Sequence, residues 1–176
     1  LGRLLKLDPK RNTALLTVGS ILAERGEYEA AIEQFRRAIG IDPNYADAWH
    51  NLSLALRHLG RLEESIEASR AAVRLKPDDA DFHGALSHTL ILSGNYLEGW
   101  REYEWRWKCK GFEGRQRMFS QPQWRGEDIA GKTILLHAEQ GLGDTIQMIR
   151  YAPLLAQRGA RVVFECFPEL YSVLRN

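Results

Sequence analysis

The residues best suited to chemistry lie in a glycine-rich segment near the C-terminal end of the chain. Glu139-Gln140-Gly141-Leu142-Gly143-Asp144 follows an apolar run that ends in His137. A glycine-rich turn between a strand and a helix lets backbone amides approach a phosphate group. A carboxylate at the same turn can instead accept a proton from a hydroxyl group. The segment therefore allows two chemistries, phosphate binding or general-base catalysis.

The spacing of the glycines disfavours a dinucleotide site. The fingerprint G-x-G-x-x-G requires a third glycine where Ile146 stands, although Glu165 lies about 20 residues on, where an acid could meet a ribose. Asp144 at the start of a helix would also repel a pyrophosphate and compete for the same amides. The dinucleotide interpretation is therefore disfavoured. A simple structural interpretation is that Asp144 only caps the helix, because Asp is a preferred N-cap residue.

Short alternating elements must position this loop. The run 133–137 predicts a buried parallel strand. A helical stretch follows, with a kink expected at Pro153 and an end at Gly159, before a second strand at 161–166. A further helix is expected from 168 to 174. The order strand, helix, strand, helix is that of the opening of a doubly wound, Rossmann-like α/β sheet.

A 34-residue repeat dominates the rest of the chain. Two series of residues recur at this interval and stay in phase: Pro9, Pro43, Pro77 and Gly26, Gly60, Gly94. In one unit, Trp49, Leu52 and Leu56 fall on one face of a helix that must stop near Gly60. A second helix spans 62–75, and Pro77 turns the chain into the next unit. Such hairpins are stable only as a stack, because each buries part of its apolar face against a neighbour.

These columns resemble the tetratricopeptide repeat family. The matching residues are Trp49, Leu52, Gly60, Ala72 and Pro77 in one unit and Leu15, Gly19, Gly26, Tyr28, Ala31, Phe35, Ala38 and Pro43 in the unit before it. The resemblance implies a mainly α fold, a right-handed superhelix of α-α hairpins that holds a protein or peptide in the groove of its first helices. In similar repeats of O-linked N-acetylglucosamine transferase, an asparagine in the column of Asn51 contacts peptide backbone. Asn51 is therefore a candidate peptide ligand, and the alternative is a solvated polar residue.

The repeat sets the expected domain boundaries. We expect a tetratricopeptide array over 1–110, with a partial unit 1–11, full units 12–45 and 46–79, and a degenerate unit 80–110. A linker is expected over 111–131, with Phe119 and Trp124 packed on a neighbour, and an incomplete α/β domain over 132–176. Aromatic residues at helical spacing predict a seam on which the next domain docks: Tyr96, Trp100, Tyr103 and Trp107.

The glycine-rich loop and the residues after it resemble a glycosyltransferase. Thr145, Gln147, Arg150, Tyr151 and Pro153 complete a likeness to the first strand–loop–helix of two-Rossmann-domain (GT-B) enzymes, especially heptosyltransferases. The chain looks similar to bacterial tetratricopeptide proteins that carry such a domain. The resemblance implies that Asp144 is the catalytic base and that the same cleft is lined by His137, Glu139, Gln140, Gly141 and Gly143.

The same resemblance limits what this chain can do alone. The nucleotide-sugar site of the family lies in a second Rossmann domain, which the sequence does not contain. We therefore expect a fragment of a longer protein that is inactive by itself and binds no cofactor, whereas the parent takes a nucleotide sugar. The alternative is a purely structural interaction protein whose α/β segment is a vestigial cap.

Composition excludes several other classes. The 176 residues carry a net charge of +1, are 44% hydrophobic and 27% charged, and contain no apolar run long enough to span a bilayer. Neither nucleic acid nor a membrane is an expected partner. Two well-separated cysteines, Cys109 and Cys166, indicate reduced thiols in a cytoplasmic protein, and scattered histidines indicate no metal site. Apolar edges of a truncated sheet favour self-association.

Overall fold

The computed structural model describes residues 9–109, 112, 117–139 and 141–174 of the chain. The chain divides into two units, residues 1–117 and 118–176. The division falls inside the expected linker, and the domain boundaries otherwise stay a prediction. Within the described residues, no helix is long and apolar enough to cross a membrane.

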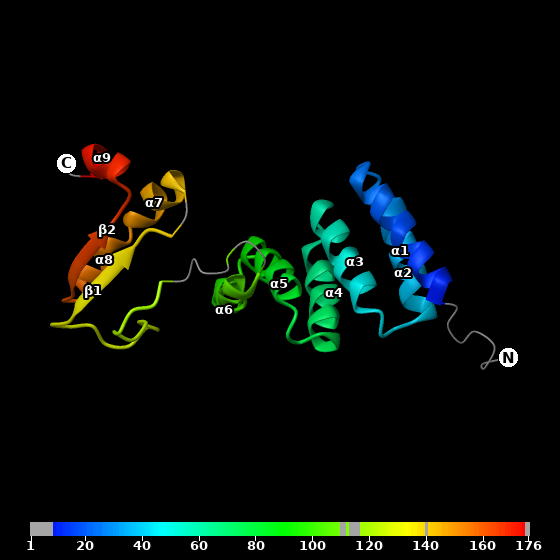
Figure 1. Ribbon diagram of the computed structural model, residues 1–176, viewed down its shortest axis with the longest axis horizontal. Helices are drawn as coiled ribbons and strands as arrows, with labels where there is room; N and C mark the ends of the chain where they lie inside the picture. Colours follow the sequence, from blue (N-terminus) through cyan, green and yellow to red (C-terminus); the bar gives the residue numbers. More distant parts are fainter. Residues whose placement is uncertain (1–8, 110–111, 113–116, 140, 175–176) are drawn as a thin grey trace. The chain divides into compact units, whose positions relative to one another are not determined.

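The first unit is a row of helical hairpins (Figure 1). Its helices pair as α1 (Pro9–Glu24) with α2 (Tyr28–Ile41), α3 (Ala46–His58) with α4 (Leu62–Leu75), and α5 (Ala80–Leu92) with α6 (Tyr96–Tyr103). Each hairpin also contacts the next, through α2 and α3 and through α4 and α5. The predicted mainly helical, tetratricopeptide-like architecture is confirmed for this unit.

Three glycines make the bends within the hairpins. Gly26, Gly60 and Gly94 have φ values of 80°, 71° and 85°, a left-handed conformation that side chains with a Cβ rarely adopt. The residue after each glycine donates its amide back to the last turn of the first helix, as Arg61 N does to Leu56 O at 3.0 Å. The predicted equivalence of the three bends is confirmed.

The first helix begins earlier than the repeat predicts. Residues 9–11 were expected to close a preceding unit, but they lie in α1, which starts at Pro9. Proline is well placed in the first turn of a helix, because its missing N–H has no intrahelical partner there. Residues 1–8 lie outside the described residues.

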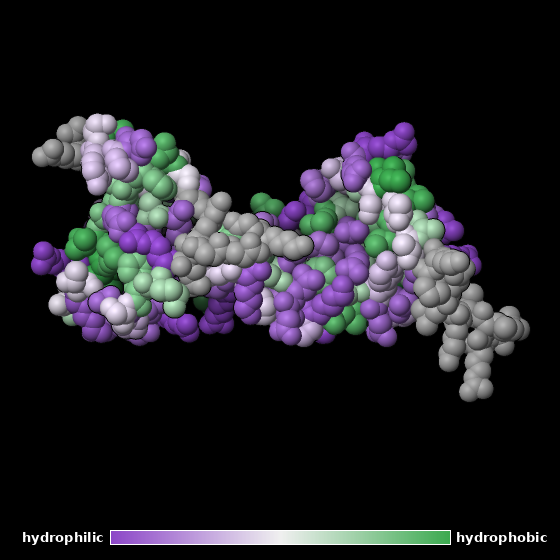
Figure 2. All heavy atoms as spheres, in the orientation of Figure 1, coloured by the Kyte–Doolittle hydropathy of each residue, from purple (hydrophilic) through white to green (hydrophobic). Residues whose placement is uncertain are grey.

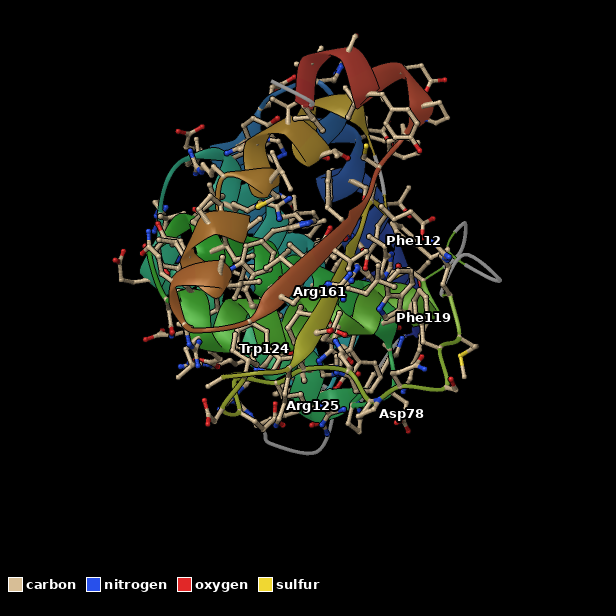
Figure 3. All side chains as sticks on the ribbon, turned by 90° about the vertical axis from the view of Figure 1, so that its left-hand side faces the viewer. Asp78, Phe112, Phe119, Trp124, Arg125 and Arg161 are labelled. Atoms are coloured by element: carbon tan, nitrogen blue, oxygen red, sulfur yellow. The ribbon has the colours of Figure 1, made fainter. Side chains whose placement is uncertain are left out.

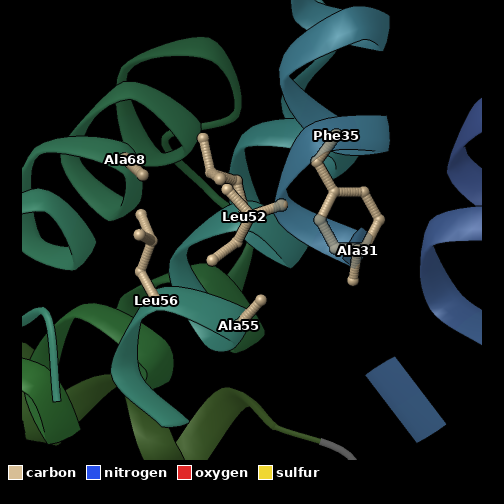
Figure 4. Close-up of a cluster of buried hydrophobic side chains, with 7 residues drawn as sticks. Ala31, Phe35, Leu52, Ala55, Leu56 and Ala68 are labelled. Carbon is tan, nitrogen blue, oxygen red and sulfur yellow. The ribbon is translucent and has the colours of Figure 1, made fainter. Parts of the chain in front are cut away.

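The centre of the stack is an apolar cluster drawn from several helices (Figure 4). Phe35, Leu52 and Leu56 are each at most 4% exposed, and they pack with small residues such as Ala31 and Ala68. Phe35 lies directly against Gly19, where an added Cβ would come within 2.4 Å of the Phe35 Cε1 atom. Ala31, one of the residues of the repeat pattern, is 0% exposed and belongs to the same cluster.

One repeat later, serines replace this aromatic–glycine pair. Ser53 and Ser69 stand in the columns of Gly19 and Phe35, and both are 1% exposed. The Ser53 hydroxyl donates to His50 O at 2.6 Å, whereas the buried Ser69 Oγ has no hydrogen-bond partner among the described residues. A buried hydroxyl without a partner destabilises the fold, because it has lost its bonds to water.

Ser69→Ala is therefore expected to raise the free energy of unfolding by about 1 kcal/mol. Chemical denaturation followed by far-ultraviolet circular dichroism measures the change. Ser65→Ala is the matched control, because Ser65 Oγ donates to Ser53 O at 2.7 Å and the same change there should destabilise the unit. Equal effects at the two serines would contradict the assignment.

Ion pairs recur with the repeat along the second helices. Arg36 on α2 bonds to Glu64 on α4 at 2.8 Å, and Arg70 on α4 bonds to Glu98 on α6 at 2.7 Å. The second pair is the first moved by one 34-residue step. One repeat after Arg70 the same position is Glu104, so the side chain there carries a negative charge instead of a positive one. Exposed pairs of this kind contribute little stability, but they favour one register of neighbouring helices.

The aromatic stripe does not continue as one helix. Helix α6 ends at Tyr103, and a 3-10 turn, η1 (Glu104–Lys108), follows it. Trp105, which lies off the predicted stripe, stacks on His83 with ring centroids 3.8 Å apart. His83 Nδ1 is also bonded to Glu102, and its Nε2 lies 2.8 Å from Pro77 O. These contacts hold the end of the unit against α5, and docking of another domain on the stripe stays a prediction.

The second unit contains a two-stranded parallel sheet, β1 (Thr133–His137) and β2 (Arg161–Glu165). Thr133 pairs with Arg161 and His137 with Glu165. Between the strands lie α7 (Leu142–Ile149) and α8 (Ala152–Gln157), and after β2 come η2 (Pro168–Leu170) and α9 (Tyr171–Leu174). The chain breaks the helix at 150–151 rather than kinking it at Pro153, which instead lies in the first turn of α8.

The prediction that the first strand is buried is wrong. Leu135 and Val163 are each 42% exposed, because α8 packs on β2 and one face of the sheet stays open. Apolar side chains are visible at the surface of this unit (Figure 2). The apolar composition of the strands therefore marks a face suited to burial that the described residues do not cover.

Residues 117–132, the described stretch directly before β1, contain no helix or strand, yet part of this stretch is packed on the second unit. Ile129 is 1% exposed. Trp124 Nε1–H donates to Glu127 O at 2.9 Å, and the Arg158 guanidinium lies 5.3 Å from the centroid of the Trp124 ring. Figure 3 shows Trp124 and Arg125 on this segment and Arg161 on β2. Phe119 and Trp124 were expected to pack on a neighbour. Each contacts a residue of the second unit, Phe119 beside His137 and Trp124 beside Arg158.

Candidate functional site

The first helices of the hairpins lie side by side, since α1 contacts α3 and α3 contacts α5. On α3, Leu52 and Leu56 are buried, whereas His50, Leu54 and Arg57 form a half-buried stripe on another side of the helix. The same columns recur on the neighbouring helices. We call these nine positions the first-helix face: Leu16, Ser20 and Ala23; His50, Leu54 and Arg57; Gly84, His88 and Ile91.

Asn51, the candidate peptide ligand, lies beside this face. Its Nδ2 donates to Ser20 Oγ on α1 at 3.3 Å, so the side chain joins two first helices. An asparagine amide has a second N–H and a carbonyl oxygen for other partners. The contact with Ser20 therefore gives Asn51 a structural role, and its role as a ligand stays a prediction.

Arg57 is the unpartnered charge on the first-helix face. Within the part of the chain that the structure describes, its guanidinium forms no hydrogen bond or ion pair, and burial lowers its pKa. The carboxylates at the N-terminal ends of α3 and α5 already have bonding partners. Asp47 bonds to Lys76 at 2.9 Å, and Asp79 accepts the amides of Asp81 and Phe82.

The surroundings of two histidines on this face lower their pKa values and so favour the neutral form. Burial lowers the pKa of His50, more than nearby Asp79, Asp81 and Asp47 raise it, and Arg57 lowers it further. His50 also stacks on Phe82, with centroids 4.6 Å apart, and its buried Nδ1 has no hydrogen-bond partner among the described residues. Burial and then the charge of Arg57 lower the pKa of His88.

His50 should make the helical unit sensitive to acid. Its pKa in the folded state lies below the ordinary value of 6.5, so the unfolded chain binds a proton more readily. Stability is then retained above pH 6.5 and lost as the pH falls below that value. We expect His50→Phe, which keeps the stacking on Phe82, to reduce the loss of unfolding free energy between pH 7.5 and pH 5. An unchanged pH profile would contradict this assignment.

The second candidate site lies at the loop after β1. Gly141, with φ of 57°, is the N-cap of α7, and Asp144 is in the first turn, exposed and without a capping bond. The alternative that Asp144 is the N-cap is therefore wrong. Thr145, which is buried, closes the turn by donating Oγ1 to Gly141 O at 2.9 Å.

The other predicted residues of this loop are only partly assembled. His137 ends β1, with its ring centroid 5.1 Å from that of Phe119, and no hydrogen bond or ion pair joins it to Asp144. Glu139 is exposed between β1 and α7, and Gly143 lies in α7. Gln140 lies outside the described residues. Of the described loop residues, Gly141 lies beside the Asp144 carboxylate, since an added Cβ there would be 3.2 Å from Asp144 Oδ2.

Neither metal nor disulfide chemistry is indicated. Over the residues that the structure places, no group of three or more His, Cys, Asp or Glu could hold a metal ion. Cys109 and Cys166 are free and half-buried, and burial raises the pKa of the Cys109 thiol. That thiol is therefore a poor nucleophile.

Comparison with known proteins identifies the helical repeats. Family models described as "TPR repeat" and "Tetratricopeptide repeat" match residues 19–56 and 46–79. Residues 19–79 are therefore tetratricopeptide repeats. The chain is 28% identical over 149 residues to Protein FlbA of Caulobacter vibrioides, a match that covers 83% of this chain and 25% of FlbA. The chain thus spans about a quarter of the length of this relative.

Solved structures show the same fold in the helical unit. An O-GlcNAc transferase mutant from Thermobaculum terrenum aligns with a TM-score of 0.57 at 25% identity, over 61% of this chain and 21% of that chain. The crystal structure of MamA aligns with a TM-score of 0.53 at 25% identity, over 58% and 60%. The first repeat domain of Spaghetti (RPAP3), bound to the HSP90 peptide SRMEEVD, aligns with a TM-score of 0.56 at 18% identity, over 58% and 81%.

No role for Arg57 was predicted from the sequence. Its column contains Ala23 and Ile91, so a charged residue stands where its neighbours in the repeat are small or apolar. Comparing the columns of the first helices for such a departure would have identified it.

Proposed function

We propose that the helical unit is a protein-interaction scaffold that receives a peptide segment of a partner along the first-helix face. The supporting observation is a row of three adjacent first helices, of which the middle one, α3, carries polar groups with unused bonding capacity: His50, Asn51 and Arg57. The RPAP3 repeats with a bound HSP90 peptide support the same use of the fold.

Selection from a displayed library of random 12-residue peptides, followed by amide NMR of the chain with a selected peptide, tests this proposal. We expect chemical shift changes to concentrate on α1, α3 and α5. Changes confined to α2 and α4, or a library that yields no binder, would contradict it.

The loop after β1 favours a second function for the longer protein, transfer of a sugar from a nucleotide donor. The supporting observation is the exposed Asp144 in the first turn of α7, shortly after the carboxyl end of a parallel strand. Ligands of open α/β sheets bind at this edge. In this proposal Asp144 is the general base. In the alternative, the protein has a purely structural role, transfers no sugar, and carries the α/β segment as a vestigial cap.

Calorimetry with UDP- and ADP-sugars separates these possibilities. We expect no tight binding to the 176-residue chain and measurable binding to the longer protein. In the longer protein, Asp144→Asn should lower transfer by at least about 100-fold while leaving donor binding unchanged. Tight binding to the chain itself would refute the expectation that the donor site lies elsewhere.

A further inference from the structure

The outer side of α1 exposes residue positions that the repeat buries in the other first helices. Val18 and Ile21 are 47% and 48% exposed. In α3 the same columns hold Leu52 and Ala55, which are 4% and 2% exposed and belong to a core cluster that includes Ile32 of α2. The equivalent positions of α5, at most 3% exposed, are Leu86 and Thr89. Helix α1 therefore presents the surface with which a first helix packs on the second helix of a preceding hairpin.

The outer side of α6 exposes the complementary positions. Tyr96 and Trp100 are 60% and 47% exposed. In α2 the column of Trp100 holds Ile32, which is 3% exposed. The column of Tyr96 holds Tyr28, which stacks on His58 of α3 with ring centroids 4.6 Å apart. Helix α6 therefore presents the surface on which the first helix of a following hairpin packs.

These two exposed surfaces lie at opposite ends of the row of hairpins (Figure 1). We call them the head, formed by Val18 and Ile21 on α1, and the tail, formed by Tyr96 and Trp100 on α6. Exposed apolar surfaces often mark sites of protein interaction. Within the array the equivalent surfaces meet twice, where α2 packs on α3 and where α4 packs on α5. The chain thus contains two examples of the contact that a head and a tail would form.

We propose that the chain assembles head to tail with a second copy of itself, α6 of one copy packing on α1 of the next as α2 packs on α3. Such a contact joins two different surfaces, so it can continue from copy to copy. It would set α5 of one copy beside α1 of the next and extend the first-helix face across the joint. The inference goes beyond the proposed peptide binding, because the occupant of these ends is the protein itself.

The charges at the joint agree with a second copy as the occupant. Inside the array, Arg36 on α2 bonds to Glu64 on α4 at 2.8 Å. At the tail the arginine column holds Glu104, which is paired with Arg106 at 2.8 Å. At the head the glutamate column holds Ala30. Glu104 of one copy would therefore face an alanine of the next, and no two like charges would be brought together.

Light scattering on the 176-residue chain over a series of concentrations tests the inference. We expect the average molar mass to rise with concentration above the 20.1 kDa of one copy. Ile21→Glu removes the head and Trp100→Glu removes the tail, so each variant alone should stay monomeric. An equal mixture should form dimers and nothing longer, because each dimer joins the intact tail of one variant to the intact head of the other.

Leu97→Glu is the matched control. Leu97 lies on α6 and is 71% exposed, but its column holds Glu29 and Glu63, so it lies outside the tail. The control should associate like the native chain, and circular dichroism checks that all variants stay folded.

Three results would overturn the inference. A constant molar mass of 20.1 kDa up to about 1 mM protein would show that copies do not meet and that another part of the protein, such as the α/β unit, is the occupant. Dimers of one variant alone would show that two heads or two tails pair. Association of both variants alone would place the contact elsewhere, for instance at the open face of the sheet.

Discussion

Replacing Phe35 with alanine is expected to lower the unfolding free energy of the helical unit by about 3–5 kcal/mol. Phe35 is 1% exposed and contributes the only aromatic ring among the fully buried residues of the described core cluster. Its removal leaves a cavity between α1, α2 and α3 that the small neighbours cannot fill. Urea denaturation of the whole chain, followed by circular dichroism at 222 nm, measures the loss. A loss below about 1 kcal/mol would contradict this view of the core.

A double-mutant cycle with Gly19 shows whether the ring and the glycine act as a pair. Gly19→Ala alone should destabilise the unit by about 1–3 kcal/mol, because the new Cβ would lie 2.4 Å from Phe35 Cε1. In the Phe35→Ala background the same change should stabilise α1 by up to about 1 kcal/mol, since alanine is the better helix former. Additive effects would exclude the pairing.

Gly99→Ala should have the next largest effect, a loss of about 1–3 kcal/mol. A Cβ at Gly99 would lie 2.7 Å from Ile91 Cγ1 and 3.1 Å from the backbone nitrogen of Ile91, so α6 would have to move away from α5. That movement would also break the bond from Ser87 Oγ to Gly99 O, which measures 2.9 Å. Differential scanning calorimetry measures the change.

Gly84→Ala is the matched control. Gly84 lies within α5, and a Cβ there meets no atom within 4 Å. The same substitution should therefore raise stability by up to about 1 kcal/mol through helix propensity alone. A destabilising Gly84→Ala, or a neutral Gly99→Ala, would show that steric contact does not distinguish the two glycines.

The repeat could be predicted from the sequence because its period is carried by residues with strong backbone preferences. Glycine at the left-handed bends and proline after the second helix mark the hairpins whatever lies between them. The apolar columns then locate the core, as Phe35, Leu52 and Leu56 show. The strands 133–137 and 161–165 were predictable for a similar reason, since each is a short apolar run beside a glycine-containing turn.

The ends of the elements depended on contacts that no local pattern contains. Helix α6 was expected to extend through Trp107. Instead, His83 on α5 contacts both Trp105 and Glu102, and after Tyr103 the chain continues as the 3-10 turn η1. The exposure of Leu135 and Val163 could not be predicted either, because apolar strands look alike whether or not both faces are covered.

The candidate sites, too, were only partly predictable from the sequence. The position of Asp144 after a strand followed from the glycine-rich motif, but its place in the first turn rather than at the cap depends on the φ of Gly141. Arg57 carried no motif at all. Its lack of a partner among the described residues appears only when the packing shows which charges are already paired.

The recurring pair of Arg36 with Glu64 and Arg70 with Glu98 has a consequence for how such a chain can lengthen. Duplication of residues 46–79 in place would put an arginine opposite a glutamate at each new junction, so the array can grow from its middle. Joining the same segment after the third hairpin would set Glu104 opposite the new glutamate, and the two negative charges would repel. Gene duplication or design therefore has a permitted insertion point inside the array and an unfavourable one at this end.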